Sequence, residues 1–144
     1  MVSHRLLASF LVALTIGTAM PALAVDPGNP TPTLRAARAD IEAERWVAAI
    51  EKLRRIVEAD DTNADAYNLL GYALRHTGSN DRAMQAYVRA LSLDPQHAGA
   101  LEYQGELFII MGEPDKARAN LALIEAICGT ACEEYVDLAE AIDG

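Results

Sequence analysis

The chain has 144 residues, of which 51% are hydrophobic and 23% charged, a composition typical of a globular protein rather than a disordered or collagenous one. Twelve basic side chains against twenty-one acidic ones give a formal net charge of −9, which argues against DNA, RNA or an anionic membrane surface as the main partner. Two cysteines and three histidines are too few for a disulfide-dense scaffold or a many-ligand metal framework.

Residues 1–24 have the features of a secretory signal peptide. A short positive start ends at Arg5, an uncharged and mostly apolar run follows from Leu6 to Met20, and Ala22-Leu23-Ala24 forms a small-residue cleavage site. The run is too short to cross ~30 Å of hydrocarbon comfortably, so an uncleaved membrane anchor is the weaker alternative. We expect cleavage after Ala24, a periplasmic or secreted protein, and no stable membrane insertion after cleavage.

Residues 25–33 are rich in proline and form a predicted flexible leader. Beyond them the apolar residues recur at helical spacing, and no segment shows sustained alternation with period two. The sequence therefore predicts an all-α protein. Three apolar stripes carry this prediction: Trp46, Ala49, Ile50, Leu53, Ile56 and Val57; Tyr67, Leu70, Gly71 and Leu74; and Ala83, Ala86, Tyr87, Ala90 and Leu91.

The chain also matches itself when it is shifted by 34 residues. This shift superposes Ala64 on Ala98, Ala66 on Ala100, Gly71 on Gly105, Gly78 on Gly112, Asp81 on Asp115 and Ala83 on Ala117. The period and the residues that carry it resemble the tetratricopeptide repeat family. Glycine and alanine at positions 71 and 83 fit a close approach of two helices, and Gly78 fits a left-handed helix end.

The resemblance implies a tetratricopeptide α-solenoid over residues 34–142, made of three helix-turn-helix repeats and a C-terminal capping helix. The repeats are expected at about 30–63, 64–97 and 98–131, and the capping helix at 133–142. Four residues depart from the family pattern: Asp40 and Gln104 stand where large apolar residues are usual, Gly129 replaces the closing proline, and Thr33 also differs. Because a terminal repeat has one face toward water, we expect that face to accommodate Asp40.

In this family the first helix of each repeat lines a concave groove that holds a peptide or a partner's helix. By position, the resemblance assigns seven residues to this partner-binding groove: Arg38, Asn68, Tyr72, Arg75, His76, Glu102 and Glu106. An asparagine can pair with a peptide backbone, and an arginine can hold a carboxylate. The alternative interpretation is that these residues are ordinary solvated helix faces.

Cys128 and Cys132 flank the junction between the last repeat and the capping helix. In an oxidising compartment we expect a disulfide that closes this short loop. A soft metal ion bound by both thiolates beside Glu133 and Glu134, or a redox-active dithiol, are the alternatives.

Acidic residues are concentrated toward the C-terminus: residues 25–97 have a net charge of −2 and residues 98–144 a net charge of −8. This asymmetry either steers partners or simply keeps that end soluble. His76 and His97 lie near predicted helix ends, where imidazole can meet free carbonyls. No catalytic constellation, metal site or cofactor site is apparent.

We therefore expect a non-enzymatic protein-interaction module, an adaptor or assembly factor that binds a protein or peptide. A metal- or thiol-handling protein that uses Cys128 and Cys132 is the alternative.

Overall fold

The computed structural model describes residues 31–144, and the helices in this part of the chain are α1 (Leu34–Glu42), α2 (Trp46–Ala59), α3 (Ala64–His76), α4 (Asn80–Leu93), α5 (Ala98–Ile110), α6 (Pro114–Cys128) and α7 (Glu133–Asp143). The described residues contain no strand. The predicted signal peptide and residues 25–30 of the predicted leader lie outside the described residues.

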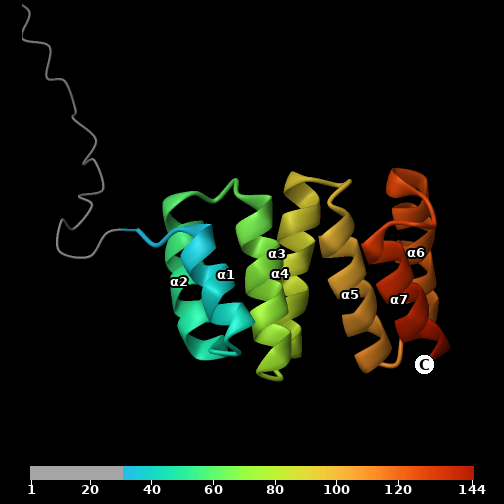
Figure 1. The fold of residues 1–144 in the computed structure, drawn as a ribbon, viewed down its shortest axis with the longest axis horizontal. Helices are drawn as coiled ribbons and strands as arrows, with labels where there is room; N and C mark the ends of the chain where they lie inside the picture. Colours follow the sequence, from blue (N-terminus) through green and yellow to red (C-terminus); the bar gives the residue numbers. More distant parts are fainter. Residues whose placement is uncertain (1–30) are drawn as a thin grey trace, which may run out of the picture.

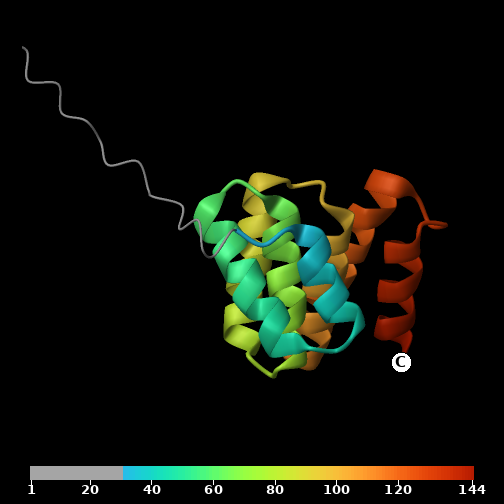
Figure 2. The ribbon, with the colours of Figure 1, turned by 60° about the vertical axis from the view of Figure 1, so that its left-hand side comes forward.

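The helices form three antiparallel hairpins, α1/α2, α3/α4 and α5/α6, which stack side by side along the long axis of the molecule (Figure 1). Helix α7 follows the last hairpin and packs against both α5 and α6, so that it closes one end of the stack (Figure 2). This arrangement confirms the predicted all-α solenoid with three repeats and a capping helix.

The turn inside each hairpin passes through a left-handed residue, and these residues lie 34 positions apart. Gly78 has a φ of 73° and Gly112 a φ of 76°, values that glycine adopts without steric cost. In the first hairpin the equivalent residue is Glu44, whose φ is 54°. The first repeat therefore keeps the turn but lacks the residue that best fits it.

Close packing of neighbouring helices depends on two glycines that were matched by the 34-residue shift. A Cβ atom added at Gly71 would lie 2.5 Å from Cε1 of Tyr87, which is fully buried on α4. At Gly105 it would lie 2.7 Å from the side chain of Leu138 on α7. The first glycine thus allows a hairpin to close, and the second allows the capping helix to dock.

Asp40 does not face water, contrary to the expectation from its place in the terminal repeat. Its side chain is buried between α1 and α2 and pairs with Lys52 and with Arg45, whose Nη2 lies 2.6 Å from Oδ1. Hydrogen bonds from Lys52 and then Arg45 hold the pKa of Asp40 below its usual value. A buried carboxylate is tolerated here because two cations accompany it.

Gln104, another departure from the family pattern, is also buried with a polar partner. Asn120 on α6 donates through Nδ2 to Oε1 of Gln104 at 3.0 Å and to the carbonyl of Leu101 at 2.9 Å. In the second repeat the equivalent positions hold Leu70 and Ala86. The third repeat has replaced an apolar pair by a hydrogen-bonded one.

Candidate functional site

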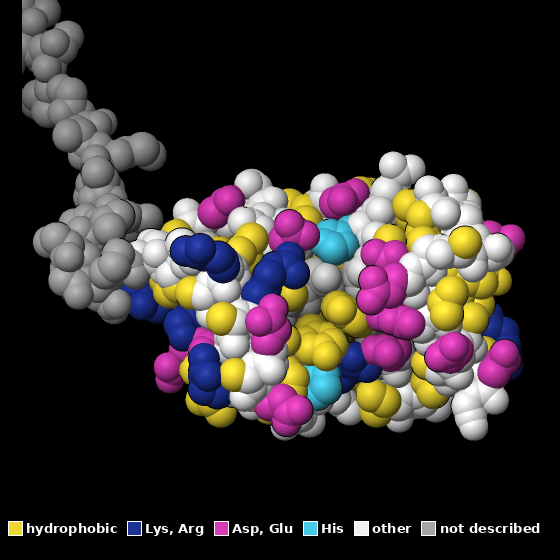
Figure 3. Space-filling model, viewed as in Figure 1, with side chains coloured by type: hydrophobic (Ala, Val, Ile, Leu, Met, Phe, Trp, Pro, Cys, Tyr) yellow, Lys and Arg dark blue, Asp and Glu magenta, His cyan; other side chains and the backbone are white. Residues whose placement is uncertain are grey.

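Helices α1, α3, α5 and α7 lie on one face of the molecule, which we call the groove face (Figure 1). On this face a hollow of about 320 Å³ opens among these four helices. Figure 3 shows acidic side chains gathered over α5 and α7, basic ones over the α1 end, and apolar ones between them. Five acids line the hollow: Asp65, Glu102, Glu133, Glu134 and Asp137, together with Arg38, Asn68, Leu69, His97, Ala98, Gly99 and Tyr103.

Glu102 is the most buried acid in this hollow, with only 6% of its surface exposed. Burial raises its pKa to about 8, and the negative charges of Glu106, Asp137 and Glu134 act in the same direction. Among residues 31–144, no cation forms an ion pair with this carboxylate. The hollow therefore contains a carboxyl group that is mostly protonated at neutral pH.

Asn68, on α3, faces the same hollow and is also only 6% exposed. Its Oδ1 atom is buried and has no hydrogen-bond partner in the described structure. Leaving such an acceptor unpaired costs about 1–3 kcal/mol, so a donor from a bound ligand would be favoured at this atom.

An aromatic cluster lies beside the hollow and links three helices. The rings of Trp46 on α2 and His76 on α3 stack at 4.1 Å, and Tyr72 lies 4.5 Å from His76 and 4.6 Å from Tyr103 on α5. Partial burial and the charge of Arg75 lower the pKa of His76, which favours its neutral form at pH 7. Trp46 thus packs between the first two repeats.

Arg75 is held within the protein. Its guanidinium forms an ion pair with Glu106 and lies 5.5 Å from the ring centre of Tyr72 and 5.8 Å from that of Tyr103. Only 12% of its side chain is exposed. Arg75 thus joins α3 to α5, and little of it is accessible to a ligand.

In the described structure, neither His76 nor His97 contacts free carbonyls at a helix end, although their positions in the sequence suggested it. His97 precedes α5, where its Nδ1 accepts a hydrogen bond from the amide of Ala100 and its Nε2 lies 3.1 Å from Oδ1 of Asp65. It caps a helix N-terminus and does not meet free carbonyls. His76 ends α3 but stacks on Trp46.

The structure places the seven sequence-predicted groove residues in two neighbouring sets. One set lines the hollow (Arg38, Asn68 and Glu102), and the other forms or adjoins the aromatic cluster (Tyr72, Arg75, His76 and Glu106). Sequence reasoning missed Tyr103, Glu134 and Asp137. The sequence shows that α7 has acidic residues. Their position facing Glu102 depends on the docking of Leu138 on Gly105, which the sequence does not show.

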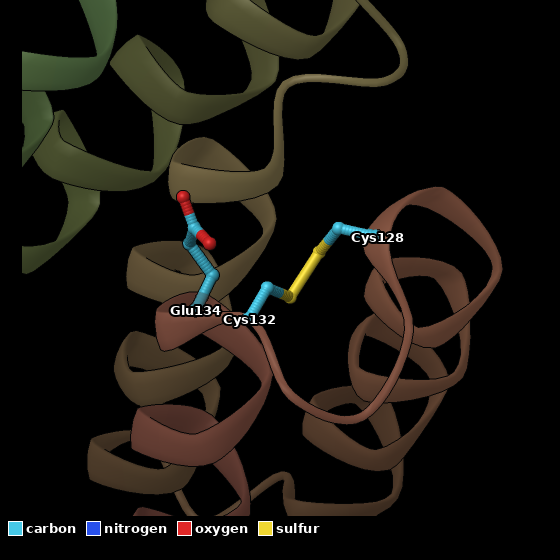
Figure 4. Close-up of side chains that lie close together, drawn as sticks. All are labelled: Cys128, Cys132 and Glu134. Carbon is cyan, nitrogen blue, oxygen red and sulfur yellow. A yellow bond between two sulfur atoms is a disulfide. The ribbon is translucent and has the colours of Figure 1, made fainter.

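Cys128 ends α6 and Cys132 directly precedes α7 (Figure 4). Their sulfur atoms lie 2.11 Å apart, which is disulfide distance, with the Cα atoms 6.0 Å apart. In Figure 4 the carboxylate of Glu134 points toward α5. The two sulfurs and one oxygen of Glu134 nevertheless lie within 4.8 Å of one another, the only such group of three potential metal ligands among the described residues.

A family model described as tetratricopeptide repeat matches residues 34–98. The crystal structure of the protein MamA is similar to the chain with 29% identity and a TM-score of 0.67. The chain contains tetratricopeptide repeats. The MamA alignment covers 77% of this chain and 65% of the MamA chain, so this tetratricopeptide protein spans less than two thirds of that relative. No curated protein sequence matches the chain.

Two further solved tetratricopeptide structures share the fold at lower identity. The second such domain of human RPAP3, solved in complex with the HSP70 peptide SGPTIEEVD, has 17% identity and a TM-score of 0.67, covering 76% of this chain and 91% of that one. PcrH, solved with the chaperone binding region of PopD, has 18% identity and a TM-score of 0.65, covering 74% and 80%.

None of the helices in residues 31–144 combines the length and the apolar character needed to span a membrane.

Proposed function

We propose that this tetratricopeptide protein is a non-enzymatic interaction module that holds a segment of a partner protein on its groove face. The observation that carries this proposal is the hollow, where the buried Oδ1 atom of Asn68 has no hydrogen-bond partner and the largely buried carboxyl group of Glu102 forms no ion pair. Buried polar groups in a folded protein are normally satisfied, so these two favour a ligand.

The character of the groove face supports a protein ligand over a small substrate. The hollow adjoins the exposed edge of the aromatic cluster, so that charged, amide and aromatic groups occupy one continuous strip across α3, α5 and α7. Interfaces are commonly anchored by aromatic side chains beside a few hydrogen-bonding groups. Two of its structural neighbours, RPAP3 and PcrH, were solved with a peptide or protein region bound.

The same proposal places the protein outside the cytoplasm, as an adaptor or assembly factor in the periplasm or as a secreted protein. It rests on the signal-like residues 1–24. Expression in a Gram-negative host, followed by fractionation and intact-mass measurement, tests it. We expect a mature chain that begins at Val25, whereas a cytoplasmic, full-length product would contradict the proposal.

A second candidate function, metal or thiol handling, rests on the grouping of Cys128, Cys132 and Glu134. Three donors are one fewer than a structural zinc site requires, and thiolates bind metal only when the sulfurs are reduced. A thiol titration of the natively purified protein separates the two functions. Two free thiols that Zn²⁺ or Cu⁺ protects would favour metal handling, and a metal-insensitive disulfide would favour the interaction module.

Site-specific photo-cross-linking tests the interaction module itself. We would place a photoreactive residue at Glu133, which is exposed and lines the hollow, and in a matched variant at Val88, which is 55% exposed on α4. Helix α4 contributes no residue to the hollow. In a periplasmic extract we expect cross-linked products from the Glu133 position and none from Val88. Equal products from both positions, or products from Val88 alone, would contradict a partner on the groove face.

A further inference from the structure

In the hollow on the groove face, the carboxyl groups outnumber the cationic side chains that could pair with them. Five carboxyl groups line it, whereas the cationic side chains in its lining are Arg38 and, when protonated, His97. His97 is already bonded to Asp65, and Arg38 is exposed and forms no ion pair with the acids of the hollow in the described structure. Glu102, Glu133, Glu134 and Asp137 are thus left without a cation.

The spacing of these carboxylates is unsuited to a bare metal ion. A metal ion needs several ligand atoms close together, and no three carboxylates of the hollow lie within 4.8 Å of one another. The volume of about 320 Å³ is also far larger than an ion. A larger cation whose donors spread over several ångströms fits this geometry better.

The buried amide of Asn68 further limits which kind of cation fits the hollow. Its Oδ1 atom can only accept, so a ligand that reaches this atom must donate a hydrogen bond to it while it pairs with Glu102 on α5. An ammonium group donates all its hydrogen bonds from a single nitrogen atom. A guanidinium has five N–H groups in a planar fork, so one side of it can meet a carboxylate while another meets the amide oxygen.

We propose that the hollow binds the guanidinium of an arginine side chain in a partner protein, held by Glu102, by Oδ1 of Asn68 and by the α7 acids Glu134 and Asp137. This inference deepens the proposed function and rests on it, because it names the chemistry of the partner. The net charge of −8 over residues 98–144 would attract such a partner before contact.

Arginine binding at this site depends on pH through Glu102. Since burial raises the pKa of Glu102 to about 8, this carboxyl group is mostly protonated at pH 7 and must lose its proton to pair with a guanidinium. Affinity should therefore rise between about pH 7 and about pH 9. The other charged or titratable groups that face Glu102 lie on four helices: Arg38 on α1, Asp65, Tyr72 and Arg75 on α3, His97, Tyr103 and Glu106 before and on α5, and Glu133, Glu134 and Asp137 on α7.

The test is an NMR titration of the ¹⁵N-labelled protein with N-acetylarginine methylamide at constant ionic strength. We expect saturable shifts of the Asn68 side-chain amide and of the Gly99 backbone amide, both at the hollow. N-acetylcitrulline methylamide has the same shape without the charge and should give no saturable shifts. The lysine analogue should bind more weakly than arginine.

Two variants with the same change in charge locate the site. At pH 9, where Glu102 is ionised, Glu102→Gln should weaken arginine binding about tenfold, the loss expected for a hydrogen bond to a charged group. Asp81→Asn, on the first turn of α4 and away from the hollow, should leave it unchanged. Thermal melts of both variants verify that they fold. The comparison of arginine with citrulline uses the wild-type protein, so it does not depend on the folding of a variant.

Four outcomes would overturn the arginine site: citrulline or lysine binding as tightly as arginine, Ca²⁺ producing the shifts that arginine does not, shifts confined to residues outside the hollow, or equal effects of the two variants. If the Glu133 position cross-links a partner while arginine fails to bind, this inference falls and the proposed function stands.

Discussion

Glu44 shows how a single residue can keep a turn that its side chain does not favour. Its φ of 54° lies in the left-handed region, where a side chain costs about 1–2 kcal/mol relative to glycine. The equivalent turns of the second and third repeats use Gly78 and Gly112. Since Glu44 is exposed and contributes nothing to the core, the first hairpin carries avoidable backbone strain.

Glu44→Gly is therefore expected to stabilise the protein by about 0.5–1 kcal/mol, the relief of strain less the greater freedom of glycine in the unfolded chain. Urea denaturation followed by circular dichroism measures the change. Glu51→Gly, an exposed position within α2, is the control and should destabilise by about 1 kcal/mol. A Glu44→Gly protein no more stable than the wild type would show that the turn is not strained.

Glu102 gives the protein a stability that depends on pH. Its pKa is raised to about 8 in the folded protein, so the native state keeps a proton that the unfolded chain releases above about pH 4.5. The stabilisation is complete below the unfolded pKa and is lost as the pH rises through the folded one. Glu102→Gln should therefore be more stable than wild type near pH 9, and its free energy of unfolding should fall less between pH 5 and pH 9. Parallel pH profiles of the two proteins would contradict this account of Glu102.

At the scale of the helical elements, the sequence predicts the structure wherever a residue recurs from repeat to repeat. It does not predict the structure where one residue that departs from the repeat pattern is paired with another. The 34-residue shift predicts the hairpins because helix length, turn glycines and small crossing residues all recur. Gln104 is visible as a departure, but its partner Asn120 is found only once α5 and α6 are packed together. In the same way, Asp40 is found to be buried only when Lys52 of α2 is seen beside it.

The Gln104 and Asn120 pair makes a prediction about how α5 and α6 associate. Gln104→Leu alone removes one of the two acceptors of Asn120 and should cost about 1–2 kcal/mol. Adding Asn120→Ala recreates the Leu70 and Ala86 pair of the second repeat and should recover most of that loss. Chemical denaturation of the wild type, the two single variants and the double variant gives the coupling energy. Additive losses would mean that the two residues do not act as a pair.

At the scale of the whole molecule, the capping helix does more than close the stack. The same docking that seats Leu138 on Gly105 carries Glu134 and Asp137 to the groove face, where they meet Glu102 of α5. The sequence predicts α7 and the assignment of Asn68 and Glu102 to the groove. It does not predict the acidic hollow, because that depends on the angle at which α7 meets α5.

The central claim is that a partner protein docks on the groove face. Hydrogen–deuterium exchange of the protein with and without the partner recovered by photo-cross-linking tests it most directly, because every helix is observed in one measurement. We predict added protection in α3, α5 and α7 and none in α2, α4 and α6. Protection confined to α2, α4 and α6 would contradict the claim.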